Sequence, residues 1–219
     1  MQNLFFILAL LLLSSVQSNA TPNEAYTKKM NEAITHLDGA KTVADFVQAA
    51  NEFSVISKVS KDEWLPLYYY AHIHVILVYV DSAADMQKKD KYLDQAETAI
   101  NKIATQFPKE SEIQILKGWY LISRLALDPP ARGATYYPAY AKAIDDAVAL
   151  DPLNPRARFF KVSNDIGAAQ FMGQPTESYC PRLEALYNEW DQYKIVSTLH
   201  PKWGKEEVKK KMVEICPAK

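Results

Sequence analysis

The sequence repeats a pattern of apolar residues at an interval of 44 positions, and this repetition restricts the folds open to the chain. Two stretches share spacings of four, three and five residues and end in proline. They are Ala96, Ile100, Ile103, Pro108 and, 44 positions later, Tyr140, Ile144, Ala147, Pro152. This pattern is typical of the second helix of a TPR unit, and a single hairpin of this kind buries its apolar stripe only against a neighbouring hairpin. The repeat therefore predicts an all-α fold, a right-handed α-solenoid of about four TPR-like antiparallel helical hairpins.

The interval is longer than the roughly 34 residues of a standard TPR repeat. We expect the extra residues of each repeat to form extended loops between the two helices of each hairpin, at residues 81–91, 128–138 and 173–182. Loops on a rigid scaffold are common sites of function. The alternative is that these loops are tolerated additions without a role.

Helix-start signals recur along the chain and no segment alternates with a period of two. They lie at Thr21–Glu24, Thr42–Asp45, Ser60–Glu63, Ser111–Gln114 and Asn154–Pro155. A short polar side chain before a helix accepts hydrogen bonds from the first free backbone N–H groups. These signals predict a helix from Thr21 to about Asp38, and further helices after each later signal.

The first twenty residues are typical of a secretory signal peptide. An apolar run from Leu4 to Leu13 precedes the small residues of Ser18-Asn19-Ala20, where cleavage is expected. The alternative, a membrane anchor, needs about 20 apolar residues. We therefore expect a signal peptide at 1–20, a single TPR-like domain at 21–219, no stable membrane insertion after cleavage, and a periplasmic or secreted location.

Cys180 and Cys216 are the only two cysteines of the chain. In an oxidising compartment two cysteines usually pair, so we expect a disulfide between them. The alternative is two separate buried thiols. The sequence offers no third ligand beside them, which argues against a cysteine-based zinc site.

Charge and motifs argue against several classes of function. A net charge of −1 is unlike the basic excess of nucleic-acid-binding proteins. Six glycines without a G-x-G pattern argue against a phosphate-binding loop. His72 and His74 lie two positions apart on an expected helix, so they point to different sides and do not share a metal ion. No nucleophile or acid pair has a catalytic setting, so we expect no enzyme activity, no cofactor and no metal site.

Candidate binding residues come from aligning the first helices of the hairpins on Glu63, Glu112 and Arg156. In TPR solenoids these helices line the concave groove. The groove positions are then Tyr70, His74, Trp119, Ser123, Arg156 and Phe159. Arg132, in an expected loop, is a further candidate because a guanidinium donates two parallel hydrogen bonds to a carboxylate.

The chain also resembles a largely uncharacterised family of exported, TPR-like proteins from Bacteroidota, over roughly residues 60 to 216. The resemblance lies in the order and spacing of several segments: Glu63–Ala71, Leu93–Glu97, Ser111–Ile113, Asp128–Gly133, Asp151–Arg156, Pro201–Gly204 and Cys216. It departs from the family at Phe171–Gln174, where a glycine-rich turn is replaced by a segment with one glycine. The resemblance implies a fold and an exported location, and brings no catalytic residue.

These observations favour a non-catalytic exported scaffold that binds a protein or peptide partner through an aromatic groove. A periplasmic protein that binds a small molecule or a glycan is the first alternative. An enzyme of unrecognised type is the second, and it would need acid or base groups converging on one cleft.

Overall fold

The computed structural model describes residues 22–217, and these form helices without any strand. The elements are α1 (Pro22–Gly39), α2 (Val43–Val59), α3 (Leu65–Val80), α4 (Met86–Gln106), α5 (Ser111–Ala126), α6 (Pro129–Leu150), α7 (Pro155–Phe171), η1 (Glu177–Tyr179), α8 (Cys180–Glu189), η2 (Trp190–Gln192) and α9 (Lys205–Ile215). The all-helical fold class is confirmed. The signal peptide and Thr21 of the first start signal lie outside the described residues.

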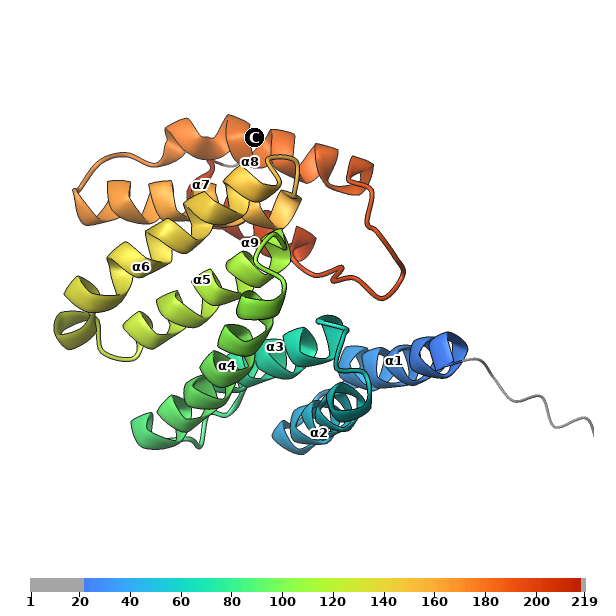
Figure 1. The fold of residues 1–219 in the computed structure, drawn as a ribbon. Coiled ribbons are helices and arrows are strands. Elements are labelled where there is room, and N and C mark those ends of the chain that lie inside the picture. Colours follow the sequence, from blue (N-terminus) through green and yellow to red (C-terminus); the bar gives the residue numbers. More distant parts are fainter. Residues whose placement is uncertain (1–21, 218–219) are drawn as a thin grey trace, which may run out of the picture.

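Consecutive helices pack as hairpins, α1 with α2, α3 with α4, α5 with α6 and α7 with α8, and α9 packs against α8. Figure 1 shows the pairs following one another in an arc from α1 to α8. The 44-residue interval reappears as direct contact between neighbouring first helices. The Tyr79 hydroxyl of α3 lies 2.7 Å from Ser123 Oγ of α5, and Arg156 of α7 binds Glu112 of α5.

The prediction of extended loops at 81–91 and 128–138 is wrong. α4 begins at Met86 and α6 at Pro129, so the extra residues lengthen the second helices to 21 and 22 residues. The carboxylate of Asp85 accepts from the backbone of Lys88, and that of Asp128 accepts from Ala131. Each aspartate thus caps an early helix start. The third expected loop, 173–182, is partly a turn before η1 and α8 begin.

The start signals have mixed outcomes. The capping box of Thr42 and Asp45 is present, and Asn154 caps α7 through the backbone of Arg156 and Ala157. The Ser60 box is wrong, because α3 begins at Leu65 without a side-chain cap. The Ser111 box is also wrong: Glu110 caps α5, and the Ser111 hydroxyl donates to the carbonyl of Ala147 on α6 at 3.0 Å.

Two apolar cores lie in this fold. The larger one runs through α1 to α7. The smaller one joins α7, α8, η2 and α9, with Trp190 and Val208 among its buried residues. Between η2 and α9, residues 193–204 form an irregular segment that we call the strap. The strap connects two elements of the smaller core, yet its Leu199 is buried in the larger one.

Gly118 of α5 is a test of how closely α5 and α6 pack. A Cβ at this position would collide with Ile144 Cδ1 and lie 3.2 Å from its Cγ1. Gly118→Leu is expected to lower the free energy of unfolding by about 2–3 kcal/mol, because overpacking forces side chains and backbone to shift. The matched control is Gly167→Leu on α7, where a Cβ meets nothing within 4 Å. It should leave stability unchanged or raise it by up to about 1 kcal/mol. Equal urea midpoints for the two variants would refute the close packing.

Candidate functional site

The strap lies across the first helices of three hairpins. Its Trp203 ring stacks on His72 of α3 at 5.2 Å and contacts Trp119 of α5 at 5.0 Å. The Trp203 carbonyl accepts from Arg156 of α7 at 3.3 Å. Figure 1 shows the strap in orange-red, leaving the end of α8 toward α1 and returning to α9.

Between the strap and helices α1 to α3 lies a hollow of about 200 Å³, which we call the aromatic cleft. Its lining combines apolar and aromatic side chains with a few polar groups. These residues are Ile34, Leu37, Asp38, Phe46, Tyr69, His72, Ile76, Thr198, His200, Lys202 and Trp203. Ligand sites have this character, an apolar wall with a small number of placed polar groups.

His72 is the unusual group in the wall of the cleft. Its side chain is 5% exposed, and neither ring nitrogen has a hydrogen-bond partner. Aromatic rings surround it, with Tyr68 and Trp203 stacked on its faces and Trp119 tilted against it. A buried polar group without a partner costs about 1–3 kcal/mol, so such a group requires a reason. A ligand in the cleft that bonds to a ring nitrogen would supply one.

The environment keeps His72 neutral. Burial, with a contribution from the charge of Arg156, lowers the pKa of His72 from 6.5 to about 3. Burial also raises the pKa values of the Tyr68 and Tyr69 hydroxyls and lowers that of His200. The buried part of the wall, at Tyr69 and His72, is therefore uncharged at neutral pH, and the charged residues Asp38 and Lys202 lie in its exposed part.

The His72 pKa predicts a pH dependence of stability. Between about pH 6.5 and 3 the unfolded chain binds a proton at this ring and the folded chain does not, so the free energy of unfolding falls as pH falls. Going from pH 7 to 5 should cost about 2 kcal/mol through this group. His72→Phe keeps a ring and removes the titrating group. From pH 7 to 5 its free energy of unfolding should therefore fall by about 2 kcal/mol less than that of the wild type.

Urea denaturation of both proteins at the two pH values measures this difference, because all other groups are the same in both. Identical pH dependences would contradict the lowered pKa of His72.

A buried ion pair contacts the end of the strap. Arg156 Nε lies 2.9 Å from both carboxylate oxygens of Glu112, and Asn154 donates to the same carboxylate at 2.7 Å. Both side chains of the pair are less than 5% exposed. The Arg156 guanidinium also lies over the Trp203 ring at 5.8 Å. The pair thus fixes α5 against α7 and positions the end of the strap.

The structure brings together three of the residues predicted to bind a partner. Trp119 and Arg156 both contact Trp203, and Phe159 packs beside Phe160, which in turn contacts Trp119. Their role in partner binding stays a prediction. In this structure Trp203 of the strap covers Trp119 and Arg156, and the sequence pattern did not indicate that.

The other four predicted residues lie elsewhere. His74 Nδ1 donates within its own helix to the Tyr70 carbonyl at 2.8 Å, and the ring centroids of the two residues are 4.3 Å apart. Ser123 is fully buried and donates to the Trp119 carbonyl. Arg132 forms a bidentate pair with Asp90 of α4, at 2.7 Å for each bond, so its expected carboxylate partner is supplied within the chain. Their binding roles also remain predictions.

Trp203 and Leu199 were not predicted as residues of a site. Trp203 belongs to the segment Pro201–Gly204 of the family resemblance. A tryptophan close to a proline and a glycine, outside any helical pattern, is the one signal in the sequence for a packed non-helical segment.

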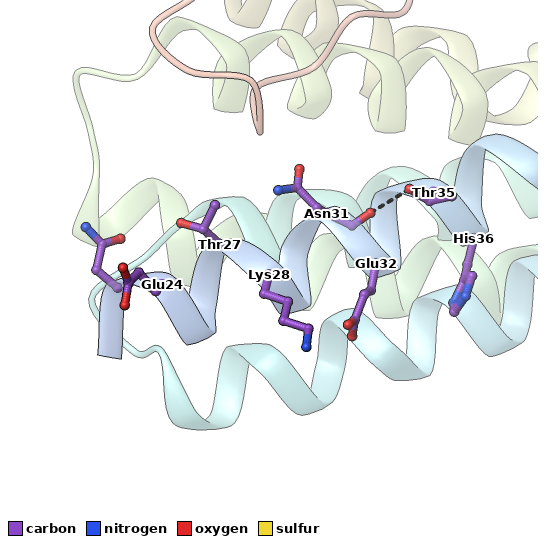
Figure 2. A pocket seen from close by; sticks show the side chains of 8 residues that line it. Glu24, Thr27, Lys28, Asn31, Glu32, Thr35 and His36 are labelled. Atoms are coloured by element: carbon purple, nitrogen blue, oxygen red, sulfur yellow. Dashed lines mark hydrogen bonds between the residues drawn. The ribbon is translucent and has the colours of Figure 1, made fainter. Parts of the chain in front are cut away.

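A larger hollow, of about 720 Å³, runs along α1. Figure 2 shows its lining: Lys28, Glu32 and His36 follow one another along the helix, and the Thr35 hydroxyl donates to the Asn31 carbonyl. All of its lining residues, 23 to 36, belong to α1. One polar helix face has no opposing wall to enclose a ligand, so we favour the smaller aromatic cleft.

Cys180 and Cys216 form a disulfide that joins the start of α8 to the end of α9, as predicted. Within residues 22–217, no group of three or more histidine, cysteine or acidic side chains is placed to hold a metal ion. Over the same residues, no helix combines the length and the apolar character that a membrane span needs.

Comparison with known proteins gives one informative match. No protein-family model and no curated protein sequence matches the chain. Among solved structures, the chain is similar to the HusA haemophore from Porphyromonas gingivalis, with a TM-score of 0.73 and 24% sequence identity. The similarity covers 89% of this chain and 94% of that one. The two chains therefore share a fold over nearly their whole lengths.

Proposed function

We propose that this chain is a non-catalytic exported binding protein that carries a flat, apolar ligand of the tetrapyrrole class in the aromatic cleft. The observation that carries the proposal is the neutral, unpartnered His72 ring, which stacks with Tyr68 and with Trp203 in the wall of a hollow. Aromatic rings offer a large apolar contact area to a flat molecule. The similarity to a protein named as a haemophore supports the choice of class.

Export and architecture belong to the same proposal. The signal-like residues 1–20 and the Cys180–Cys216 disulfide both favour an oxidising compartment, periplasmic or extracellular. We further propose that the hairpins form a right-handed solenoid of the TPR type, supported by the contacts between residues 44 positions apart. No catalytic role is proposed, because burial keeps the His72 and Tyr69 side chains of the cleft neutral.

The size of the cleft sets a condition on this function. At about 200 Å³ it is smaller than the roughly 300–1,000 Å³ of typical ligand pockets. The residues suit a tetrapyrrole in chemistry, and the strap must move for one to enter.

Titration of residues 21–219 with metal-free protoporphyrin IX, followed by its absorbance and by tryptophan fluorescence, tests the proposal. Phe46→Ala should weaken binding about tenfold or more, because an aromatic side chain of the cleft lining is removed. Phe171→Ala is the matched control, since Phe171 is 94% exposed on α7. Absence of binding by the wild type, or equal affinities of the two variants, would reject the tetrapyrrole as cargo.

A protein or peptide partner is the second candidate, and one observation favours it. The strap is itself a non-helical peptide bound across α3, α5 and α7. A labelled peptide of residues 193–204 that binds the protein with strap residue Trp203 replaced by alanine, and that does not bind the wild type, would support this function. Absence of binding to both would count against it.

A further inference from the structure

We infer that the strap is a latch over the aromatic cleft: Leu199 and Trp203 withdraw from the larger core to admit a ligand, while both ends of the strap stay anchored in the smaller core. The inference rests on the proposed ligand site. It adds two states to that function. In the closed state the strap occupies the ligand site, and in the open state the site binds the ligand.

The two ends of the strap are fixed independently of its middle. Trp190 precedes the strap and Val208 follows it, and both are buried in the smaller core with residues of α7 and α8. The Cys180–Cys216 disulfide ties α9 to α8 as well. Gly204, at φ 117°, turns the chain directly beneath Trp190. Opening the middle of the strap therefore leaves these anchors in place.

The middle of the strap is held by the side chains of Leu199 and Trp203 and makes few backbone hydrogen bonds. The Leu199 carbonyl accepts from the Tyr69 hydroxyl at 2.8 Å, and the Trp203 indole donates to the Tyr68 hydroxyl at 3.1 Å. Leu199 is 6% exposed, whereas Val196, three residues earlier, is 85% exposed. A segment with few backbone hydrogen bonds opens at a lower cost than global unfolding.

The aromatic cleft lies between the middle of the strap and α3. Thr198, His200 and Trp203 of the strap form one wall, and Tyr69 and His72 of α3 form part of the other. A ligand that reaches His72 and exceeds the hollow in size must displace the strap. The apparent affinity is then the affinity of the open state multiplied by the open fraction, so weakening the latch tightens binding.

The test compares two aliphatic truncations on the same strap, Leu199→Ala and Val196→Ala, in the chain of residues 21–219. Trypsin cleaves after Lys194 and Lys202 of the strap, and a reducing gel separates fragments that the disulfide would otherwise hold together. Leu199→Ala should speed cleavage and tighten protoporphyrin IX binding about tenfold, since a buried leucine no longer favours the closed state. Val196→Ala should change neither. Tyr69→Phe, which removes only the hydroxyl on the Leu199 carbonyl, should shift both readouts in the direction of Leu199→Ala and covers the case in which Leu199→Ala fails to fold.

The two proposals fail in different ways. If neither wild type nor Leu199→Ala binds protoporphyrin IX, the cargo is wrong, and the latch is judged by cleavage alone. Equal cleavage rates in Leu199→Ala, Tyr69→Phe and Val196→Ala overturn the latch. Faster cleavage with unchanged or weaker porphyrin binding also overturns it, because the strap would then open without exposing the site.

Discussion

Glu112→Ala is expected to destabilise this protein by about 3–5 kcal/mol, because it leaves the Arg156 guanidinium buried without its counter-charge. Arg156 donates to Glu112 through Nε at 2.9 Å, and both side chains are under 5% exposed. Asn154 would lose its acceptor as well. A domain of this size is stable by only about 5–15 kcal/mol, so the urea midpoint should fall by a large fraction.

The matched control is Asp146→Ala on α6. Asp146 pairs with Lys142 at 2.8 Å, but these side chains are 45% and 74% exposed. An exposed pair contributes about 0–1 kcal/mol, so this variant should resemble the wild type. A Glu112→Ala variant as stable as Asp146→Ala would show that the pair is not buried in solution.

The double variant Glu112→Met, Arg156→Leu separates the pair from its surroundings. Replacing both charges by apolar groups removes the uncompensated charge, so the loss should be well below the sum of the single losses. The strap should still loosen, because the bond from Arg156 to the Trp203 carbonyl is gone. Faster tryptic cleavage after Lys202 in the double variant would report this loosening.

The helices could be predicted from the sequence because their signals are local. The spacing of Ala96, Ile100 and Ile103 recurs 44 residues later and places the same faces in the core. Thr42 and Asn154 cap helices through neighbours within three residues. The wrong prediction of loops at residues 81–91 and 128–138 has a local cause too. Asp85 and Asp128 cap the early starts of α4 and α6, whereas they were predicted to be loop residues.

The site could not be predicted in the same way, because its contacts span most of the chain. Tyr69 and Leu199 are 130 residues apart, and Tyr68 and Trp203 are 135 apart. Residues 193–204 carry no periodic pattern that would indicate which helices they pack on. The groove alignment selected Trp119 and Arg156, whose binding role stays a prediction and which lie on the side of α5 and α7 that contacts Trp203. It did not reveal what covers that side.

Replacing Cys180 and Cys216 by serine is expected to lower the free energy of unfolding by about 3–4 kcal/mol. The disulfide joins residues 36 positions apart, and opening a loop of this length restores that much chain entropy to the unfolded state. The loss should concentrate on α9, whose only buried side chain is Val208 among the residues described. Hydrogen exchange should therefore rise in α9 and the strap before it rises in α3 or α5.

The wild-type protein in reductant provides the control, since it should reproduce the urea midpoint of the double serine variant, and the variant itself should not respond to reductant. The effects of Glu112→Ala and of losing the disulfide also differ in the part of the protein that they weaken. Glu112→Ala weakens the joint between α5 and α7 in the larger core, whereas loss of the disulfide frees one anchor of the strap in the smaller core. An unanchored strap leaves the larger core more often, so trypsin should cleave the reduced protein faster after Lys194 even where its helices remain folded. Unchanged cleavage of the strap on reduction would mean that the apolar contacts of Trp190 and Val208 hold its ends without the bond.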